Sequence, residues 1–183
     1  MKVLAVYASP RRDKGNSSRM LDEVLKAFPE EAEIVRLYLA DLKFTGSCAE
    51  RPCKVVGYCT VEDDMQQVYR LLQEAEIIIF ATGALFSDVS YLLKMFMERT
   101  WWMKGMLKNK IGGYVISGRR YIESAINTIH AFMLRHRMIL GGSGALGYTF
   151  TEMGTIDDDP LALRDSYATG QRLVELYNLI YSK

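Results

Sequence analysis

The sequence predicts a doubly wound α/β fold, in which helices cover both faces of a parallel sheet of five strands. Short apolar segments alternate with longer amphipathic ones along the chain, which is the pattern of successive strand–helix–strand units. The third apolar run, Ile77-Ile78-Ile79-Phe80, is continuous, as is typical of a central parallel strand buried on both faces. A chain of 183 residues suffices for one domain, residues 1–183, with a sizeable core.

The first half of the chain divides into a strand, a helix, a second strand and an irregular segment. Residues 2–8 form a short apolar run and predict a buried strand. Residues 16–28 carry apolar side chains at helical spacing, and we expect this helix to end before Pro29 because proline cannot continue it. Residues 33–39 alternate in part and predict the second strand, whereas residues 41–60 show no regular period.

The second half continues the alternation of helices and strands. Acidic residues 62–64 suit the first turn of a helix, whose apolar stripe is Met65, Val68, Tyr69 and Leu72. After the strand at 77–80, Ser87 or Asp88 can cap a helix with Leu92, Leu93, Phe96 and Met97 facing inward. The expected elements that follow are a strand at 111–117, a helix at 122–137, the start of a short fifth strand at 138–140 and a last helix opened by Asp159-Pro160.

Right-handed crossovers leave few arrangements for five such strands. We expect the flavodoxin-like order 2-1-3-4-5, which places a ligand at the carboxyl ends of strands 1 and 3. Site residues should therefore follow strands 1, 3 and 4.

The segment Ser9-Pro10-Arg11-Arg12-Asp13-Lys14-Gly15-Asn16-Ser17-Ser18 joins the first strand to the first helix. The unpaired N–H groups and the positive dipole end of a helix N-terminus form an anion site. The candidate residues for binding a phosphate here are Ser9, Arg11, Arg12, Asn16, Ser17 and Ser18. The alternative is an ordinary strand–helix loop with an Asn or Ser cap.

The loop after the first strand matches neither of the two common nucleotide-binding motifs. The chain has no G-x-x-x-x-G-K-[ST] string, and no G-x-G-x-x-G follows its first strand. A Ser- and Asn-rich loop suits a monophosphate such as FMN. The pattern S-P-R-R-x-x-G-N-S-S resembles the NADPH-dependent FMN reductases and the related iron–sulfur flavoproteins, which are flavodoxin-like. The resemblance covers nearly the whole chain and implies bound FMN, with NAD(P)H as the donor of a hydride to flavin N5.

The resemblance also implies flavin contacts after strands 3 and 4. The candidates after strand 3 are Thr82, Gly83, Ala84, Leu85 and Phe86, with Phe86 beside the flavin ring. The candidates after strand 4 are Ser117, Gly118 and Arg119, where Arg119 or Arg120 can meet the flavin or a nicotinamide phosphate. The chain departs from the family in both loops: the usual proline after strand 3 is replaced by Gly83 or Ala84, and Tyr121-Ile122-Glu123 stands where additional glycines are common. The alternatives are a packed connecting loop and a solvated arginine pair.

The three cysteines, Cys48, Cys53 and Cys59, lie where iron–sulfur flavoproteins of this family carry a four-cysteine motif. A cluster normally needs four thiolates, and this chain offers three, spaced C-x4-C-x5-C. We therefore expect no iron–sulfur cluster and no other metal, and interpret the three as free thiols in a loop that covers the site or a subunit contact. His130 and His136 lie on a predicted helix far from the cysteines, and no side chain is predicted to be catalytic.

The charge and the apolar pattern of the chain limit the classes of partner that the sequence predicts. A formal net charge of +1, spread along the chain, predicts neither a nucleic-acid nor a membrane partner. No apolar run is long enough to span a bilayer and no signal-peptide core is evident, so we expect a cytoplasmic protein. Residues 95–106 are rich in methionine and tryptophan, which indicates a homodimer interface or, alternatively, simple core packing.

The function predicted from these observations is an FMN-dependent oxidoreductase that passes electrons from NAD(P)H to a quinone, a flavin or another acceptor. One alternative is a flavodoxin-like electron carrier related to the iron–sulfur flavoproteins. Such carriers are usually strongly acidic, so the nearly neutral charge favours the enzyme. The other alternative is a regulatory protein that has kept the fold and lost the flavin.

Overall fold

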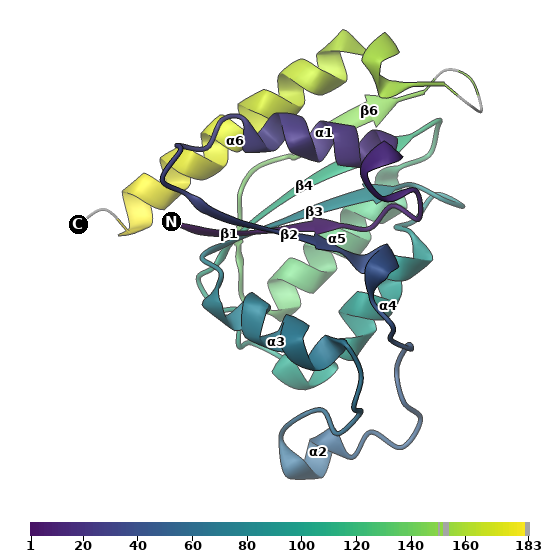
Figure 1. Ribbon diagram of the computed structural model, residues 1–183, viewed down its shortest axis with the longest axis vertical. Coiled ribbons are helices and arrows are strands. Elements are labelled where there is room, and N and C mark those ends of the chain that lie inside the picture. Colours follow the sequence, from purple (N-terminus) through teal and green to yellow (C-terminus); the bar gives the residue numbers. More distant parts are fainter. Residues whose placement is uncertain (150, 152–153, 182–183) are drawn as a thin grey trace.

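Six strands form one parallel sheet in the computed structural model, which describes residues 1–149, 151 and 154–181 (Figure 1). The strands are β1 (Lys2–Tyr7), β2 (Glu33–Tyr38), β3 (Ile77–Gly83), β4 (Ile111–Gly118), β5 (Ile139–Leu140) and β6 (Ala145–Tyr148). The order is β2-β1-β3-β4-β5, and β6 also pairs with β4. The predicted flavodoxin-like order is confirmed.

Helices cover both faces of the sheet (Figure 1). They are α1 (Asn16–Leu25), α2 (Cys53–Val56), α3 (Met65–Glu74), α4 (Tyr91–Arg99), α5 (Glu123–Arg135) and α6 (Pro160–Tyr181). The 3-10 turns are η1 (Arg12–Lys14), η2 (Leu39–Asp41), η3 (Trp101–Met103) and η4 (Ile156–Asp158). Within the described part of the chain, no helix combines the length and the apolarity that a membrane span requires.

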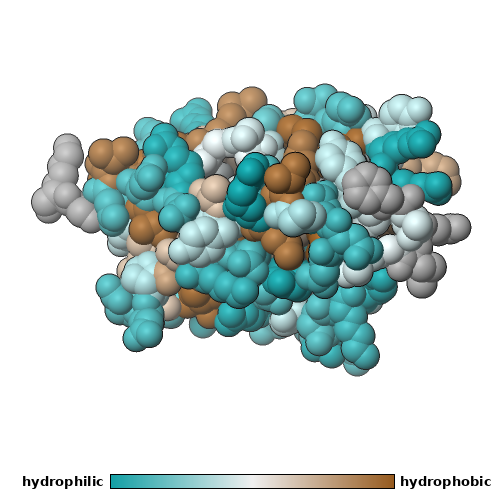
Figure 2. Space-filling view, turned by 90° about the horizontal axis from the view of Figure 1, so that it is seen from above, coloured by the Kyte–Doolittle hydropathy of each residue, from teal (hydrophilic) through white to brown (hydrophobic). Residues whose placement is uncertain are grey.

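The core consists of two layers, one on each face of the sheet. Leu4, Val6 and Phe80 pack with α3, α4 and α5, whereas their neighbours Ala5 and Ile79 pack with α1 and α6. This alternation follows from the strand geometry, because successive side chains point to opposite faces. The outer side of the α6 layer intersperses hydrophilic and apolar residues (Figure 2), as expected of a helix with one face on the sheet.

The predicted fifth strand is divided in two. It begins at Ile139 and stops at Leu140, and the sheet edge resumes as β6, which the sequence analysis did not predict. Between them the backbone turns through Gly142 and Gly144, whose φ angles are +128° and +68°. A Cβ at Gly144 would lie 2.4 Å from the Tyr114 ring, so this excursion requires glycine.

The predicted cap of α4 was wrong. Ser90, and not Ser87 or Asp88, caps the helix, since its Oγ accepts a hydrogen bond from the Leu93 N–H at 3.3 Å. The same hydroxyl donates to the Ala8 carbonyl at 2.7 Å and so ties α4 to the end of β1. Ser87 and Asp88 instead belong to a tight turn that begins at Leu85, where Leu85 and Asp88 exchange backbone hydrogen bonds.

Several predicted boundaries also move. β3 and β4 extend to Gly83 and Gly118, so the first candidates after each predicted strand are strand residues. Helix α1 ends at Leu25, before the predicted end at residue 28, and the irregular segment 41–60 contains the short helix α2. These shifts leave the order of the elements unchanged.

Candidate functional site

A cavity of about 540 Å³ lies at the carboxyl ends of β1, β3 and β4, at the edge of the sheet where the topology predicts a ligand. Its volume is typical of small-molecule sites, which measure roughly 300–1,000 Å³. The residues that line it are Ser9, Pro10, Arg11, Asn16, Ser17, Gly83, Ala84, Leu85, Ser117, Gly118, Arg119, Thr149 and Thr151. The structure thus brings together residues from all three predicted loops.

The N-terminus of α1 opens onto this cavity without a side-chain cap among the described residues. Its N-cap residue is Gly15, and a Cβ there would lie only 2.2 Å from Ser9 Oγ, so the loop can close over Ser9 only with glycine. Ser9 Oγ also accepts a hydrogen bond from the Arg11 N–H at 3.2 Å. Among the residues that the structure describes, no side chain accepts from the first-turn N–H groups, which leaves them available to an anion.

Asn16 lines the cavity but uses its amide to hold another segment. Its Nδ2 donates to the Gly154 carbonyl at 3.0 Å, and its Oδ1 accepts from the Ile156 N–H at 3.2 Å. These bonds fasten the segment after β6 to the first loop. Asn16 is therefore a positioning residue as well as part of the wall.

Thr149 and Thr151 are lining residues that the sequence analysis missed. The Thr149 N–H donates to the Gly118 carbonyl at 2.9 Å, which places the segment after β6 beside the end of β4. The signal was available in principle, because Ala145 to Tyr148 is a short strand whose carboxyl end faces the same edge. The sequence analysis predicted no strand at 145–148 and therefore offered no candidate there.

The two glycines at the ends of β3 and β4 serve different purposes. A Cβ at Gly83 would meet only the Ser117 carbonyl oxygen, at 3.8 Å, so the space beside Gly83 is open. A Cβ at Gly118 would lie 2.6 Å from Ile122 Cγ2 and 3.1 Å from Ala84 Cβ. Gly83 therefore leaves room for a ligand, whereas Gly118 allows the chain to pack against itself.

Two candidates from the first loop lie outside the lining. The guanidinium of Arg12 pairs with Asp41 at 2.8 Å and lies over the Tyr38 ring, 5.5 Å from its centroid. The Ser18 hydroxyl donates to the carbonyl of Arg12 and so stabilises the loop from within. Both side chains shape the first loop rather than its cavity surface.

Two candidates from the β3 end also lie outside the lining. Thr82 is fully buried, and its Oγ1 accepts a hydrogen bond from the Ser90 N–H at 2.9 Å. Phe86 stands fully exposed in the turn after Leu85, with a φ of +49° that is unusual for a bulky residue. The sequence could not distinguish these positions from Gly83, because all follow one apolar run.

The lining carries positive charge. Arg11 and Arg119 both contribute to it, and none of the described lining residues is acidic. Together with the α1 N-terminus, these guanidinium groups favour an anionic ligand.

The histidines lie away from this cavity. His130 Nε2 is 3.0 Å from Tyr114 Oη, on the α5 side of the sheet. His136 is buried beside Thr100, and burial, aided by Arg135, lowers the pKa of its imidazole to about 4 despite a hydrogen bond to the Met103 backbone. Neither takes part in the candidate site.

The cysteines line a different, smaller cavity of about 30 Å³, near α4. In residues 1–149, 151 and 154–181, no three His, Cys, Asp or Glu side chains are grouped so that they could hold a metal ion.

The sequence matches a known family. Residues 1–151 match the model of the NADPH-dependent FMN reductase family. An iron–sulfur flavoprotein of Methanocaldococcus jannaschii is 32% identical over 192 aligned positions, covering 98% of this chain and 99% of the relative. An NAD(P)H dehydrogenase (quinone) of Syntrophus aciditrophicus is 27% identical, covering 86% of this chain and 78% of the relative.

Solved structures share the fold. A crystal structure of RosB with bound 8-demethyl-8-formylriboflavin-5′-phosphate superposes with a TM-score of 0.80 at 16% identity, covering 100% of this chain and 81% of RosB. A flavodoxin-type, WrbA-like protein of Agrobacterium tumefaciens gives 0.64 at 16% identity, covering 97% of this chain and 98% of that protein. At these identities the likeness concerns the fold, which is flavodoxin-like as predicted.

Proposed function

Because this chain belongs to the NADPH-dependent FMN reductase family, we propose that it is an enzyme that passes electrons from NAD(P)H to a quinone, a flavin or another small acceptor. Its membership makes it a flavin-dependent oxidoreductase; the donor and the acceptor are the proposal. The observation that carries it is the uncapped N-terminus of α1, which opens onto a cavity with two arginines and no described acidic residue.

The residues at this end of the cavity fit the phosphate of FMN. Ser9 and Ser17 supply hydroxyl groups, Arg11 supplies a guanidinium, and the first turn of α1 supplies backbone N–H groups. Asn16 holds the neighbouring segment in place and thereby keeps the pocket closed on one side.

The opposite end fits the flavin ring system. The space left open at Gly83 lets a flat ligand approach the backbone of residues 83–85, and Ser117 forms the neighbouring wall. When bound, FMN supplies the hydride-accepting and electron-transferring chemistry, so the protein has to bind and orient it. We assign Arg119 to the phosphate of the nicotinamide donor or to the flavin edge, because Arg119 lines the cavity.

An electron carrier is the second candidate function. The relative from Methanocaldococcus jannaschii that spans this whole chain is named an iron–sulfur flavoprotein, which favours it. The nearly neutral net charge of +1 favours the enzyme, because carriers find their partners through strong surface charge.

A homodimer is part of the proposal. Of the apolar residues at 95–106, Phe96 and Met103 are buried in the core, whereas Trp101 and Met106 remain 42% and 49% exposed. Leu85, Phe86 and Tyr121 are also exposed, in the loops after β3 and β4. A second copy that covers these groups would bury them and form a further wall of the cavity. A protein that is active and that light scattering shows to be a monomer would contradict this assignment.

The deciding experiment is a titration of the flavin-free protein with FMN and with riboflavin, followed by absorbance. If the α1 end binds the phosphate, FMN should bind at least about 10-fold more tightly than riboflavin, since a charged hydrogen bond contributes about 1.5–3 kcal/mol. Equal affinities would contradict the phosphate assignment, and no binding of either would contradict a flavin site.

The FMN-loaded protein then separates the two functions. Steady oxidation of NADPH or NADH with a quinone supports the reductase. Rapid reduction by a ferredoxin without nicotinamide oxidation supports the carrier.

A further inference from the structure

The segment 46–60, here the cysteine loop, projects below α3 and carries the short helix α2 (Figure 1). Its tip buries little apolar surface, since Val55 and Tyr58 are 91% and 56% exposed. Yet all three cysteines of the chain, Cys48, Cys53 and Cys59, line one cavity beneath it. Three thiols at one small cavity call for a chemical explanation.

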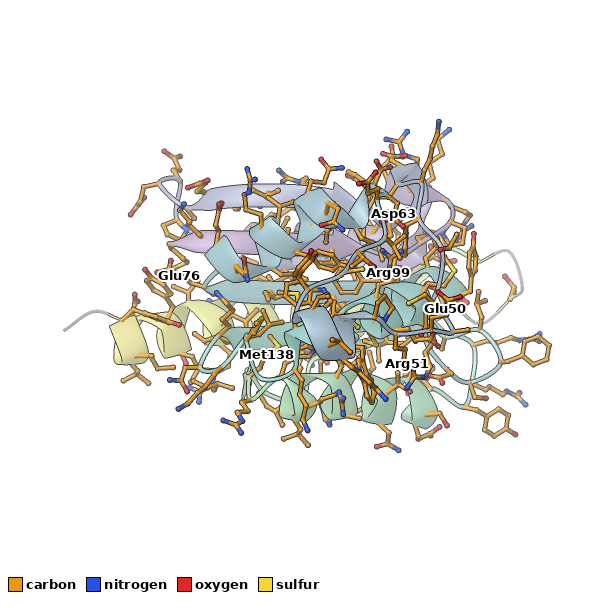
Figure 3. All side chains as sticks on the ribbon, turned by 90° about the horizontal axis from the view of Figure 1, so that it is seen from below. Glu50, Arg51, Asp63, Glu76, Arg99 and Met138 are labelled. Carbon is orange, nitrogen blue, oxygen red and sulfur yellow. The ribbon has the colours of Figure 1, made fainter. Side chains whose placement is uncertain are left out.

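The base of the loop is fastened to the body by a buried arginine. Arg99, at the end of α4, is 4% exposed. Its Nη2 donates to Asp63 Oδ1 at 3.0 Å, and its Nη1 donates to the Thr45 carbonyl at 3.1 Å. Figure 3 shows Asp63 and Arg99 together, and the loop residue Arg51 lines the same cavity as Arg99. The loop therefore has a fixed base and a lightly held tip.

The same arginine reaches a cysteine. Arg99 Nη2 lies 3.5 Å from the sulfur of Cys59, which is 9% exposed at the edge of the cavity. Burial alone would raise the pKa of this thiol, but hydrogen bonds with Tyr69, with the Val61 backbone and with Arg99 outweigh it, and the net pKa is lowered. A thiolate beside a buried cation is the form that reacts with electrophiles.

An iron–sulfur cluster, which the names of the relatives imply, does not fit this cavity. A cluster normally needs four thiolates, and the chain has three cysteines. The cavity measures about 30 Å³, which is space for one or two water-sized molecules. The guanidinium of Arg99 already occupies the wall beside Cys59.

We propose that the cysteine loop is a thiol oxidation site, in which Cys59 reacts with hydrogen peroxide and then forms a disulfide with Cys48 or Cys53. The cavity that Cys59 lines has room for a molecule of this size. Cys48 and Cys53 are both partly exposed on the lightly held part of the loop, so either can approach without disturbing the core.

The chemistry balances with peroxide as the oxidant. The Cys59 thiolate attacks one peroxide oxygen, the O–O bond breaks, and hydroxide leaves and takes up a proton to form water. The thiolate of the second cysteine, formed by loss of its proton, attacks the sulfur of the resulting sulfenic acid; the S–S bond forms, the S–O bond breaks, and the hydroxide that leaves takes up that proton to form a second water. Two thiols and one peroxide thus give one disulfide and two waters, and a dithiol reductant reverses the oxidation.

The test treats the reduced full-length protein with one to ten equivalents of hydrogen peroxide and traps the remaining thiols with N-ethylmaleimide. Intact-mass spectrometry should show the loss of two alkylation sites, and peptide mapping should place the bond between Cys59 and one of the other two cysteines. C59S should abolish the disulfide. Of C48S and C53S, one should abolish it and the other should leave it unchanged, which identifies the second cysteine.

Three results would overturn the proposal. Three alkylatable thiols after ten equivalents of peroxide would show that Cys59 is unreactive. A disulfide between Cys48 and Cys53 that forms equally well in C59S would show that Cys59 takes no part. Anaerobic incubation with iron and sulfide that yields four irons per chain would show that the loop holds a cluster after all.

Discussion

The two cavities of this protein are built in different ways. The large cavity lies at the ends of β1, β3 and β4, and backbone bonds between these strand ends, such as Ala84 N–H to the Ser117 carbonyl at 2.8 Å, fix its walls. The small cavity lies under one projecting loop, and the side chain of Arg99 holds that loop through Asp63 and Thr45.

Because of this difference, replacements at the two cavities should affect different properties, namely ligand binding and the stability of the folded state. At the large cavity many small residues share the task, so a replacement that points into open space, as at Gly83, changes the ligand's fit and leaves the fold intact. At the small cavity a buried ion pair between Arg99 and Asp63 holds the base of the loop, so its loss affects the folded state. The predictions on Arg99, on the two glycines and on the first-loop arginines test the two sides of this contrast.

The largest effect is expected from Arg99→Ala. The variant leaves Asp63, whose side chain is only 14% exposed, without its partner, and removing one member of a buried pair costs about 3–5 kcal/mol. Urea unfolding should show this loss, whereas FMN affinity should stay within about 3-fold of the original because the sites do not share residues. Arg164→Ala is the matched control, since the Arg164–Asp165 pair is exposed and its loss should cost less than about 1 kcal/mol. A loss below 1 kcal/mol for Arg99→Ala would remove the contrast.

The second prediction compares two glycines of the large cavity. Gly83→Leu should fill the open space and weaken FMN binding about 100-fold, or ~2.7 kcal/mol, with little change in unfolding free energy. Gly118→Ala should instead lower the unfolding free energy by about 1–3 kcal/mol, because its Cβ would overlap Ile122. Titration with FMN and urea unfolding of both variants measure the two effects. The opposite assignment of the two losses would contradict the roles given to these glycines.

The glycines also show how much of the candidate site can be predicted from the sequence. The strand order follows from buried runs such as 77–80, and residues at strand ends are thereby brought to one edge, so Gly83 and Ser117 were predictable. What each side chain does there depends on neighbours distant in sequence. Arg12 pairs with Asp41, and Asn16 binds the segment 154–156; no local pattern encodes either contact.

The third prediction concerns pH. The pKa of His136 is about 4 in the folded protein, below its ordinary value of 6.5, so the unfolded chain binds the proton more readily. Stability should be complete above pH 6.5 and fall as the pH drops from 6.5 towards 4, with a loss of about 2 kcal/mol at pH 5. Urea unfolding at pH 7.5 and pH 5 measures it, and His136→Gln should flatten the dependence. A variant that keeps the full slope would assign the effect to other groups.

The smallest effect is expected from the two neighbouring arginines of the first loop. Arg11 lines the large cavity, whereas Arg12 is paired with Asp41. Arg11→Ala should weaken FMN binding about 10-fold, or ~1.4 kcal/mol, and leave riboflavin binding unchanged, because only FMN carries the phosphate. Arg12→Ala should change neither affinity by more than about 3-fold, since its exposed ion pair contributes less than about 1 kcal/mol. Equal losses for FMN and riboflavin in Arg11→Ala would mean that Arg11 supports the loop and does not bind the phosphate. The comparison of these two adjacent residues therefore distinguishes a residue that contacts the ligand from one that only stabilises the loop.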